Sequence, residues 1–429
     1  MDIRISPAKG FGGTIPAVAS KSAAHRLMIC AALADTSIAI RCPEKSRDIC
    51  ATAACLSALG ARFSETEDGY TVTPISQVNE NAVLDCGESG TTYRFMLALV
   101  SCLGTGASLV GHGRLPARPL SPLYETLTGS GVLLSPQGTN PLSVSGQLSG
   151  REFSFPGNVS SQYASGLLLA FPCLARRENA PVSLTLTGKI ESLPYLDMTV
   201  RAMREFGVPV EQKWQADGTL RFTVSPADYH APTAVSVEGD YSGAAFYLAA
   251  GAIGPSPVTL THLDTNSPQG DREILSLLRR FGARVEESEG GIRVSPAPLS
   301  GITIDASQIP DLVPILAVVA AAAYGETRIE NAARLRLKES DRLETVHRLI
   351  ETLGGDISEG EDFLVIRGSA RLRGGTVSAE NDHRIAMSAA VASLVSDEPV
   401  TILGAECAEK SYPRFYDDAK ALGFSVTVI

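Results

Sequence analysis

The chain of 429 residues is too long for one ordinary hydrophobic core, so two domains are expected. Its 37 Lys and Arg against 47 Asp and Glu give a formal net charge of −10, which argues against a nucleic-acid binder, because such proteins carry a basic footprint. Apolar runs such as Leu312 to Tyr324 are shorter than the ~20 residues of a membrane-spanning helix.

The cysteines show no CxxC pair, and no signal peptide precedes them. They are therefore expected to be reduced and mostly buried thiols in a cytoplasmic globular protein. The eight cysteines are Cys30, Cys42, Cys50, Cys55, Cys86, Cys102, Cys173 and Cys407.

Six segments along the chain share one form, in which an amphipathic helix ends at a glycine and a β-type run follows. In chain order they are "LSALGARF", "LTGSGVLL", "AMREFGVPVE", "LLRRFGARVEE", "LIETLGGDIS" and "AKALGFSVTV". Their glycines are Gly60, Gly131, Gly207, Gly282, Gly354 and Gly423, spaced roughly 70 to 76 residues apart. The spacing exceeds the ~20–50 residues of a solenoid repeat. It predicts a unit of two helices and several strands, repeated three times in each of two domains.

A second kind of helix precedes each of these segments and is apolar nearly all round, which predicts burial on every side. In chain order these helices are "SAAHRLMICAALA", "TTYRFMLALVSCL", "SSQYASGLLLAFPCLA", "YSGAAFYLAAGAIG", "DLVPILAVVAAAAYG" and "HRIAMSAAVASLV".

The starts of the buried helices are polar. The residues there are Lys21–Ser22, Gly90–Thr91, Ser160–Ser161–Gln162, Asp240, Asp311 and Asp382–His383–Arg384. Ser, Thr and Asp are expected as helix N-caps whatever the function. Cations are disfavoured there by the helix dipole unless an anion also binds the exposed amides. Five cations are predicted in or beside first turns, namely Lys21, Arg26, Arg342, Arg384 and Lys410, and they indicate an anion-binding cleft inside an acidic protein.

The stretch "ARLRLKESDRLETV" at 333–346 changes its period. Arg334, Arg336 and Lys338 alternate with leucines, and the apolar residues then recur at three- and four-residue steps. The pattern predicts a strand with one cationic face that runs into an amphipathic helix. Such a strand is either a sheet edge protected by charge or a binding surface for an anion.

Ten motifs together resemble the 5-enolpyruvylshikimate-3-phosphate synthase family of enolpyruvyl transferases. They are "ASKSAAHR" (19–26), "GESGTTYR" (87–94), "ARPL" (117–120), "GNVSSQYASGLLLA" (157–170), "ESLPYLDMT" (191–199), "EGDYSGAAF" (238–246), "IPD" (309–311), "RLKESDRL" (336–343), "ENDHRIAM" (380–387) and "EKSYPRFY" (409–416). One such motif is weak, but ten in the family's order across nearly the whole chain are highly specific.

The resemblance implies an α/β fold of two inside-out domains, each with three repeats of a two-helix, four-strand unit. The domains implied are 1–16 with 236–429, and 17–235, with the active site in the cleft between them. The chain would cross near 13–20 and 232–240, where Gly and Pro occur.

The reaction that the resemblance implies moves the enolpyruvyl group of phosphoenolpyruvate to the 5-hydroxyl of shikimate 3-phosphate and releases phosphate. The residues implied for phosphoenolpyruvate are Lys21, Gly90, Arg118, Gln162, Arg342, Arg384 and Lys410. Those implied for shikimate 3-phosphate are Lys21, Ser22, Arg26, Ser160, Ser161, Gln162, Ser192, Asp311 and Lys338. On this interpretation Lys338, Glu339 and Arg342 belong to the site and do not protect an edge strand.

The chemistry needs one proton on the methylene carbon of phosphoenolpyruvate and one proton removed from the hydroxyl, which suits two carboxylates with opposite roles. The resemblance implies that Asp311 is the base, that Glu339 is the acid and that Lys21 also takes part. Two simpler interpretations stay open: Asp311 could only cap its helix, and Glu339 could only pair with Lys338 or Arg342. No metal or other cofactor is implied, and no nucleic acid or membrane; a monomer is expected.

Two residues depart from the family's pattern. Glu88 stands where an Asn is usual beside the phosphoenolpyruvate site, and Arg334 replaces an Asn on the shikimate side. We expect Glu88 to be neutralised by a neighbouring cation, with Arg118 or Lys410 as candidates. Alternative functions are the sister transferase that acts on UDP-N-acetylglucosamine, which has Lys–Asn in place of Lys21–Ser22 and a loop cysteine that "GHGRLPARPL" lacks, and a catalytically silent relative that only binds ligands or proteins.

Overall fold

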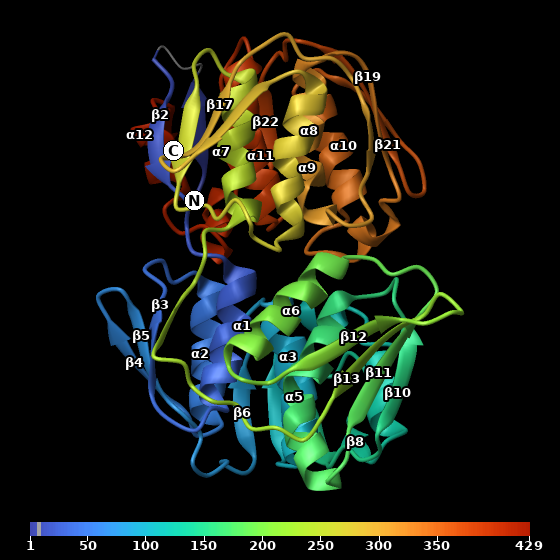
Figure 1. Ribbon diagram of the computed structural model, residues 1–429. Helices are drawn as coiled ribbons and strands as arrows, with labels where there is room; N and C mark the ends of the chain where they lie inside the picture. Colours follow the sequence, from blue (N-terminus) through green and yellow to red (C-terminus); the bar gives the residue numbers. More distant parts are fainter. Residues whose placement is uncertain (7–9) are drawn as a thin grey trace. The chain divides into compact units, whose positions relative to one another are not determined.

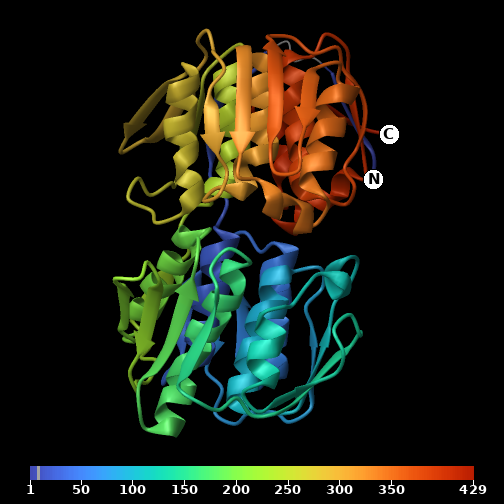
Figure 2. The same ribbon diagram turned by 90° about the vertical axis from the view of Figure 1, so that its right-hand side faces the viewer.

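The computed structural model of the protein describes residues 1–6 and 10–429. The chain divides into two compact units: unit 1 comprises Met1–Ser20 with Glu238–Ile429, and unit 2 comprises Lys21–Val237. Each unit contains three four-stranded sheets among the described residues. In each unit the helices lie inside and the sheets lie around them (Figures 1 and 2), so the predicted inside-out α/β fold is confirmed.

Unit 2 holds six α-helices within 21–237, all of them described. They are α1 (Lys21–Ala32), α2 (Arg47–Ala58), α3 (Gly90–Leu103), α4 (Leu123–Thr128), α5 (Ser161–Glu178) and α6 (Leu193–Glu205), with the short 3-10 helix η1 (Leu115–Ala117). Its first sheet, β14-β3-β5-β4, joins Ala234–Ser236, Ile38–Arg41, Gly69–Thr73 and Arg62–Thr66. Its second, β6-β7-β9-β8, joins Ala82–Asp85, Ala107–Val110, Leu142–Gly146 and Val132–Leu134. Its third, β10-β11-β13-β12, joins Glu152–Pro156, Val182–Thr187, Leu220–Val224 and Val210–Trp214.

Unit 1 repeats the arrangement. The described helices are α7 (Tyr241–Ile253), α8 (Ile274–Phe281), α9 (Val313–Ala322), α10 (Arg342–Thr352), α11 (His383–Ala392) and α12 (Phe415–Ala421), with the 3-10 helices η2 (Gly270–Glu273), η3 (Pro310–Leu312), η4 (Ala333–Leu337), η5 (Ser393–Val395) and η6 (Ala405–Lys410). The sheet β16-β17-β15-β2 joins Arg284–Ser288, Gly291–Ser295, Val258–Thr261 and Gly13–Pro16. The sheet β18-β19-β21-β20 joins Thr303–Asp305, Tyr324–Glu330, Leu364–Ser369 and Asp356–Glu359. The sheet β22-β23-β1-β24 joins Gly375–Ser378, Val400–Leu403, Ile3–Ser6 and Ser425–Val428.

One repeat is seen without interruption in the order β6–α3–β7–α4–β8–β9. Strands β6 and β7 are parallel, with Ala82 opposite Ala107, and α3 connects them. Strand β9 then pairs antiparallel with both β7 and β8. A parallel pair requires such a crossover, whereas the antiparallel strands need only a short turn. The predicted two-helix, four-strand repeat is therefore correct.

The six apolar helices are the buried ones, as predicted. In α9 every residue from Val313 to Ala321 is buried, and in α7 only Ser242 and Ile253 are not. The helices of the other kind, such as α8 and α10, have one buried face and one exposed face. They lie closer to solvent and end at the glycines that the sequence singled out.

These glycines are needed for two physical reasons. Gly60 has φ +117° and Gly423 has φ +95°, both in the left-handed region that favours glycine. A Cβ atom on Gly423 would lie 1.7 Å from the carbonyl oxygen of Gly10, and one on Gly60 would lie 2.4 Å from that of Gln77. At these two positions the chain thus turns from a helix toward a strand where a side chain has no room.

The two segments that connect the units pair with one another inside unit 1. The Ser20 amide donates to the Glu238 carbonyl (2.8 Å), and Ala19 and Gly239 form an isolated antiparallel bridge. The Gln269 side chain donates to the Gly239 carbonyl (2.7 Å) and accepts from the Tyr241 amide (2.9 Å). Both connecting segments are thus anchored at the edge of unit 1.

The prediction of a strand at 333–337 is wrong, because these residues form the 3-10 helix η4. Leu335 is 1% exposed and its amide donates to the Ala332 carbonyl, while Leu337 is 52% exposed. The two leucines therefore do not share a buried face as they would in a strand. The helix predicted after them is correct and is α10.

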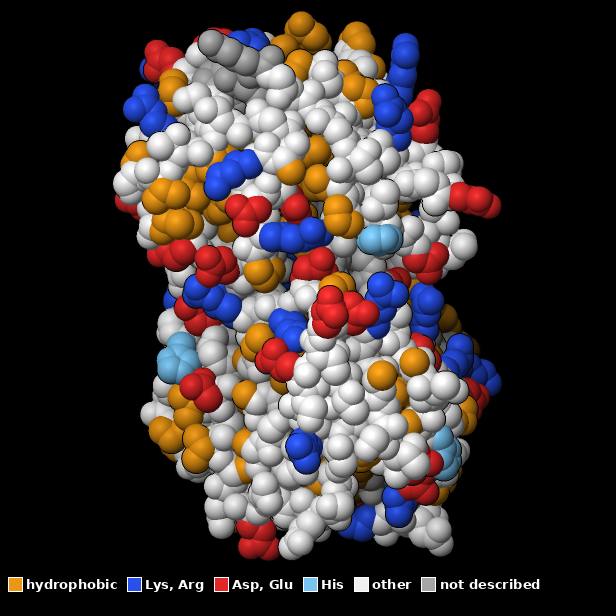
Figure 3. Space-filling model, turned by 90° about the vertical axis from the view of Figure 1, so that its left-hand side faces the viewer, with side chains coloured by type: hydrophobic (Ala, Val, Ile, Leu, Met, Phe, Trp, Pro, Cys, Tyr) orange, Lys and Arg blue, Asp and Glu red, His pale blue; other side chains and the backbone are white. Residues whose placement is uncertain are grey.

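Surface and cysteine properties agree with the composition. On the face drawn in Figure 3, Lys and Arg side chains are interspersed with Asp and Glu. Only Cys50 is exposed and Cys173 half-buried among the eight cysteines, so the prediction of mostly buried thiols is confirmed. Among the described residues no helix is long and apolar enough to cross a membrane.

Candidate active site

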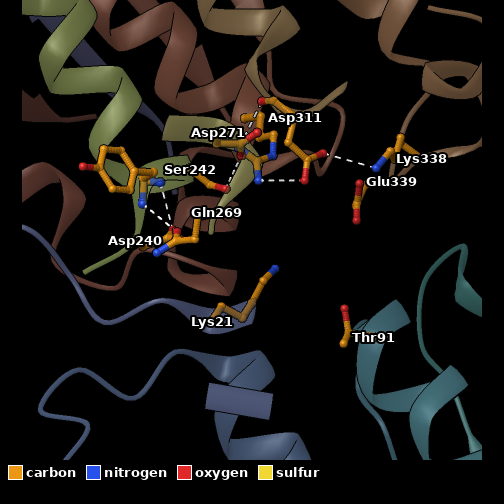
Figure 4. A network of polar contacts seen from close by, with 12 residues as sticks. Lys21, Thr91, Asp240, Ser242, Gln269, Asp271, Asp311, Lys338 and Glu339 are labelled. Atoms are coloured by element: carbon orange, nitrogen blue, oxygen red, sulfur yellow. Dashed lines mark hydrogen bonds and ion pairs between the residues drawn. The ribbon is translucent and has the colours of Figure 1, made fainter. Parts of the chain in front are cut away.

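In unit 1, Asp311 is the centre of a cluster of charged groups that the sequence singled out separately. It lies in η3, directly before α9, and caps neither helix, because Ile309 and Leu312 hold the cap positions. Its Oδ1 accepts from Arg342 Nη1 (2.7 Å) and from Lys338 Nζ (3.3 Å), and its Oδ2 lies 3.2 Å from Arg384 Nη2. Figure 4 shows the carboxylate of Asp311 reaching toward Lys338. The interpretation of Asp311 as a helix cap is therefore wrong.

Arg342 connects this carboxylate to two others. Its side chain is 1% exposed at the first position of α10. Nη2 donates to Glu339 Oε2 (2.6 Å), and Nε donates to Asp382 Oδ2 (2.8 Å). Asp382 in turn caps α11 by accepting from the Arg384 amide (3.0 Å). The pairing of Glu339 with Arg342 is thus present, and it holds Glu339 beside the group that also holds Asp311.

The electrostatics of the cluster favour the charged forms of Arg342 and Asp382 but not that of Lys338. Burial lowers the pKa of Arg342, but the charges of Asp382, Glu339 and Asp311 outweigh burial and raise the pKa above its ordinary value. Burial raises the pKa of Asp382, and the charge of Arg342 more than reverses this, so the pKa is lowered overall. Burial removes water from the Lys338 ammonium and lowers the pKa of Lys338, and this effect is larger than the opposing attraction of Asp311.

Lys410 lies in the same unit, but not at a helix start. It is the last residue of η6, buried, and its Nζ donates to the Asn381 carbonyl (2.8 Å). Asn381 and Glu380 before it both have positive φ, at +56° and +49°. This turn leads directly into α11, so Lys410 is tied to the segment that carries Asp382 and Arg384. Lys410 is thus not in a first turn along the chain, but its ammonium lies beside the start of α11.

In unit 2, Lys21 and Ser22 begin α1, and Arg26 lies in its second turn. Lys21 Nζ is 2.9 Å from Asp48 Oδ2 in the first turn of α2. Arg26 is 2% exposed and donates to the hydroxyls of Thr199 (2.7 Å) and Ser165 (3.3 Å) and to the carbonyls of Ser22 and Tyr195. Burial lowers the pKa of Arg26 to about 10, so the group stays charged at neutral pH.

Gly90 is the first residue of α3 and lies against two guanidinium groups. A Cβ atom there would be 2.5 Å from Arg94 Nη1 and 2.9 Å from Arg118 Nη1. Arg94 Nη1 also donates to Gln162 Oε1 (3.0 Å), and Gln162 Nε2 donates to Thr91 Oγ1 (2.9 Å). A side chain at position 90 would displace these two guanidinium groups, and the structure brings together Gly90, Arg118 and Gln162, three of the residues named for the site.

The serines predicted for the site lie at the starts of α5 and α6. Ser160 caps α5 by accepting from the Gln162 amide (3.3 Å), and Ser161 follows as the first helical residue. Ser192 precedes α6, is 2% exposed and has φ +55°, an uncommon conformation for a residue with a side chain. Helix starts leave backbone N–H groups without partners inside the helix, and these groups attract anions.

Sequence reasoning missed Arg94 and Asp382 as members of these clusters. Arg94 is 4% exposed and orients the amide of Gln162, and Asp382 is fully buried under Arg342. Both stand inside motifs quoted above, and for Arg94 a charged residue within a buried helix was the signal that could have found it. Of the two departures, Glu88 lies near Gly113, whose Cβ would be 2.9 Å from its Oε2, and Arg334 lies in η4, where its charge helps to lower the pKa of Lys338.

The two clusters have the groups that binding and turnover of phosphorylated acids require. Unit 1 supplies two partly exposed carboxylates, Asp311 and Glu339, on one buried arginine. Unit 2 supplies buried cations beside helix starts. Such a set can hold phosphate or carboxylate groups, and the carboxylates can exchange protons with a ligand.

The family model described as EPSP synthase (3-phosphoshikimate 1-carboxyvinyltransferase) matches residues 5–419. Relatives named 3-phosphoshikimate 1-carboxyvinyltransferase include one from Clostridium kluyveri, 37% identical over 98% of this chain and 97% of its own, and one from Clostridium perfringens, 39% identical with the same coverage. A solved structure of EPSP synthase from Acinetobacter baumannii is similar, with 26% identity, full coverage of both chains and a TM-score of 0.79.

These matches agree with the folding pattern of the six repeats and with the ten motifs. The identity to the two clostridial relatives extends over nearly the whole chain, so no large segment stands outside the likeness. The chain belongs to the EPSP synthase family of transferases, whose reaction is a step of the shikimate pathway.

Proposed function

We propose that this chain transfers the enolpyruvyl group of phosphoenolpyruvate to the 5-hydroxyl of shikimate 3-phosphate, with Asp311 as base and Glu339 as acid. These roles rest on one observation, which is that Arg342 donates hydrogen bonds to both carboxylates. Its Nη1 lies 2.7 Å from Asp311 Oδ1, and its Nη2 lies 2.6 Å from Glu339 Oε2. One rigid cation thus fixes the separation of the two proton-transferring groups. Asp311 also has Lys338 and Arg384 as neighbours, which matches a position beside bound anions.

The proton transfers balance in this assignment. Asp311 takes the hydroxyl proton as the oxygen bonds to the central carbon of phosphoenolpyruvate, and Glu339 gives a proton to the methylene carbon. When the tetrahedral adduct collapses, the bond from carbon to the phosphate oxygen breaks and the methyl carbon returns its proton to Glu339. The departing phosphate takes up the proton that Asp311 gained, so both carboxyl groups return to their starting forms. Carboxylic acids in this role contribute on the order of 10²–10⁴ in rate.

The charge of the substrates explains the number of cations. Each phosphate group carries about −1.5 to −2 charge at neutral pH, and each substrate adds a carboxylate, so roughly five negative charges must be offset. We assign phosphoenolpyruvate to Lys21, Gly90, Arg118, Gln162, Arg342, Arg384 and Lys410. We assign shikimate 3-phosphate to Lys21, Ser22, Arg26, Ser160, Ser161, Gln162, Ser192, Asp311 and Lys338. Arginine suits such positions because its planar fork binds phosphate or carboxylate through two hydrogen bonds.

The assigned residues come from both units, so the proposal includes closure of the units on the substrates. Neither set of cations alone offsets both substrates. Small-angle scattering should give a smaller radius of gyration when both ligands are bound. An unchanged radius together with measured binding of both ligands would contradict closure. A monomer in the cytoplasm completes the proposal.

Phosphate release with both substrates is the experiment that tests the proposed function. We expect release that needs phosphoenolpyruvate and shikimate 3-phosphate together and that survives a chelator. Release with UDP-N-acetylglucosamine in place of shikimate 3-phosphate would favour the sister transferase. Binding of shikimate 3-phosphate without release would favour a silent relative.

A further inference from the structure

Lys338 and Glu339 stand on a short irregular segment between η4 and α10. Residues 338–341 are neither helix nor strand, and Lys338 has an extended backbone with φ −85° and ψ −160°. An irregular segment has no backbone ladder that fixes it, so side chains must do so. The proposed acid, Glu339, lies in its middle.

Arg336 precedes this segment and contacts two separate parts of unit 1, the start of α10 and the turn after β20. Its Nη1 donates to both carboxylate oxygens of Asp341 (3.2 and 3.0 Å). Its Nη2 donates to Glu359 Oε1 (3.1 Å) and to the Gly360 carbonyl (2.7 Å), and its Nε donates to the Glu361 carbonyl (3.1 Å). A guanidinium group has five N–H donors, so these five contacts use its whole capacity on the protein itself.

The contacts close the segment from both ends. Asp341 is the N-cap of α10 and accepts from the Glu344 amide (3.3 Å), so its bond to Arg336 fixes the position where the segment enters the helix. Glu359, at the end of β20, also accepts His347 from α10 (3.1 Å between Oε2 and Nδ1). The turn after β20 is therefore joined to Arg336, which precedes the segment, and to α10, which follows it. Arg336 bonds both to this turn and to Asp341 at the end of the segment.

We infer that Arg336 is a positioning residue for Lys338 and Glu339. The inference rests on the roles proposed above for these two residues. Arg336 holds the segment so that Glu339 reaches Arg342 and Lys338 reaches Asp311. Arginine is required because a lysine, with one nitrogen, cannot join Asp341, Glu359 and two carbonyls at once.

Arg336→Gln tests the inference through kcat. We expect kcat to fall about ten- to a hundredfold, because a misplaced acid or base loses that much, while KM for phosphoenolpyruvate stays within about threefold. Arg367→Gln is the matched control: Arg367 lies in β21 of the same sheet, 3.4 Å from Glu326 and 3.6 Å from Asp356, and is 55% exposed. Its kcat should stay within about twofold of wild type. Equal kcat values in the two variants would overturn the inference.

A double variant separates positioning from general loosening of the fold. If Arg336 acts through Glu339, then Arg336→Gln should add less than about a threefold loss to that of Glu339→Gln. Losses that multiply would show that Arg336 does not act through Glu339, and the inference would be wrong. If Arg336→Gln does not fold, Arg336→Lys takes its place in the same measurements. Its kcat should lie below that of wild type, with a smaller loss than the one expected for Arg336→Gln. Full turnover of Glu339→Gln alone would instead overturn the proposed function.

Discussion

The charged clusters of the two units hold their cations in different ways. In unit 1, Arg342 and Arg384 are held by the carboxylates of Asp311, Glu339 and Asp382. In unit 2, the acceptors reported for Arg26 are hydroxyls and backbone carbonyls, and those for Arg94 are an amide and a carbonyl. Lys21, which pairs with Asp48, is an exception.

The difference indicates a difference in task. A cation with carboxylate partners is largely neutralised, and the carboxylates stay oriented for proton transfer. A cation with neutral partners keeps its charge for a ligand, and a bound anion supplies the missing opposite charge. On the function proposed above, unit 1 then carries the proton chemistry in addition to some ligand contacts, while the unit 2 cations mainly bind anions.

The largest effect is expected when the carboxylates proposed for proton transfer in unit 1 are removed. Asp311→Asn and Glu339→Gln should each lower kcat by ~10²–10⁴ in the phosphate-release assay, the range for loss of a positioned acid or base. Glu344→Gln in α10 is the control, because Glu344 is half-exposed and its side chain pairs with Arg348. Full turnover in either carboxylate variant would refute the proposed mechanism.

Asp271 is a buried carboxylate of unit 1 that, unlike Asp311, is not held by a cation through a hydrogen bond among the described residues. Its Oδ2 accepts from the Ser242 hydroxyl, and its Oδ1 has no hydrogen-bond partner in the described part of the chain. Burial, and then the charge of Asp311, raise its pKa to about 6, against the opposing effects of Arg384 and Ser242, with Asp240 a further acidic neighbour. The pKa in the folded protein is above that of the unfolded chain, so the folded state binds the proton more tightly. Stability from this group is present below pH ~4 and is lost as the pH rises toward 6.

Asp271→Asn removes this titration. Relative to the variant, the wild type should lose up to ~3 kcal/mol of unfolding free energy between pH 4 and 7, since one pKa unit corresponds to about 1.4 kcal/mol. Urea unfolding at several pH values measures it. Asp217→Asn is a control, because the bonds from Thr219 lower the pKa of Asp217 and move its titration below this range. Parallel stability curves for wild type and Asp271→Asn would contradict the prediction.

In unit 2, Arg26→Met should weaken binding of shikimate 3-phosphate by about 10- to 100-fold, because hydrogen bonds to a charged group contribute ~1.5–3 kcal/mol. Stability should change little, because the hydroxyls of Thr199 and Ser165 remain bonded to each other at 2.9 Å. Calorimetric titration measures the affinity. Binding within twofold of wild type would remove Arg26 from the site.

The smallest expected effect is at Glu88. If a neighbouring cation neutralises Glu88, Glu88→Gln frees that cation, and KM for phosphoenolpyruvate stays level or rises. If Glu88 instead repels the ligand, the repulsion is on the order of 1 kcal/mol at partly wetted distances. A fall in that KM of about fivefold or more would favour repulsion and contradict our expectation.

Much of the fold could be predicted because helix burial and glycine turns are local patterns. The buried helices, the six helix-ending glycines and the three repeats per domain all followed from them. The strand expected at 333–337 could not be judged correctly, because the alternation of Arg and Leu there looks like a strand. Only packing shows that Leu335 is buried and Leu337 is not.

The candidate site was harder to derive from the residues alone. The motifs implied which side chains belong together, and within each unit several of them do lie together. Asp382 and Arg336 were missed because their importance depends on contacts between segments far apart in the chain: Asp382 is 40 residues from Arg342, and Glu359 is 23 residues from Arg336. No local spacing encodes such contacts.

The division between proton transfer in unit 1 and anion binding in unit 2 is tested most directly by the dissociation constant of shikimate 3-phosphate in Glu339→Gln and Arg26→Met, measured beside kcat. We predict that Glu339→Gln binds within about threefold of wild type while kcat falls at least about a hundredfold, and that Arg26→Met weakens binding about tenfold or more. Equal loss of affinity in both variants, or wild-type binding by Arg26→Met, would contradict the division.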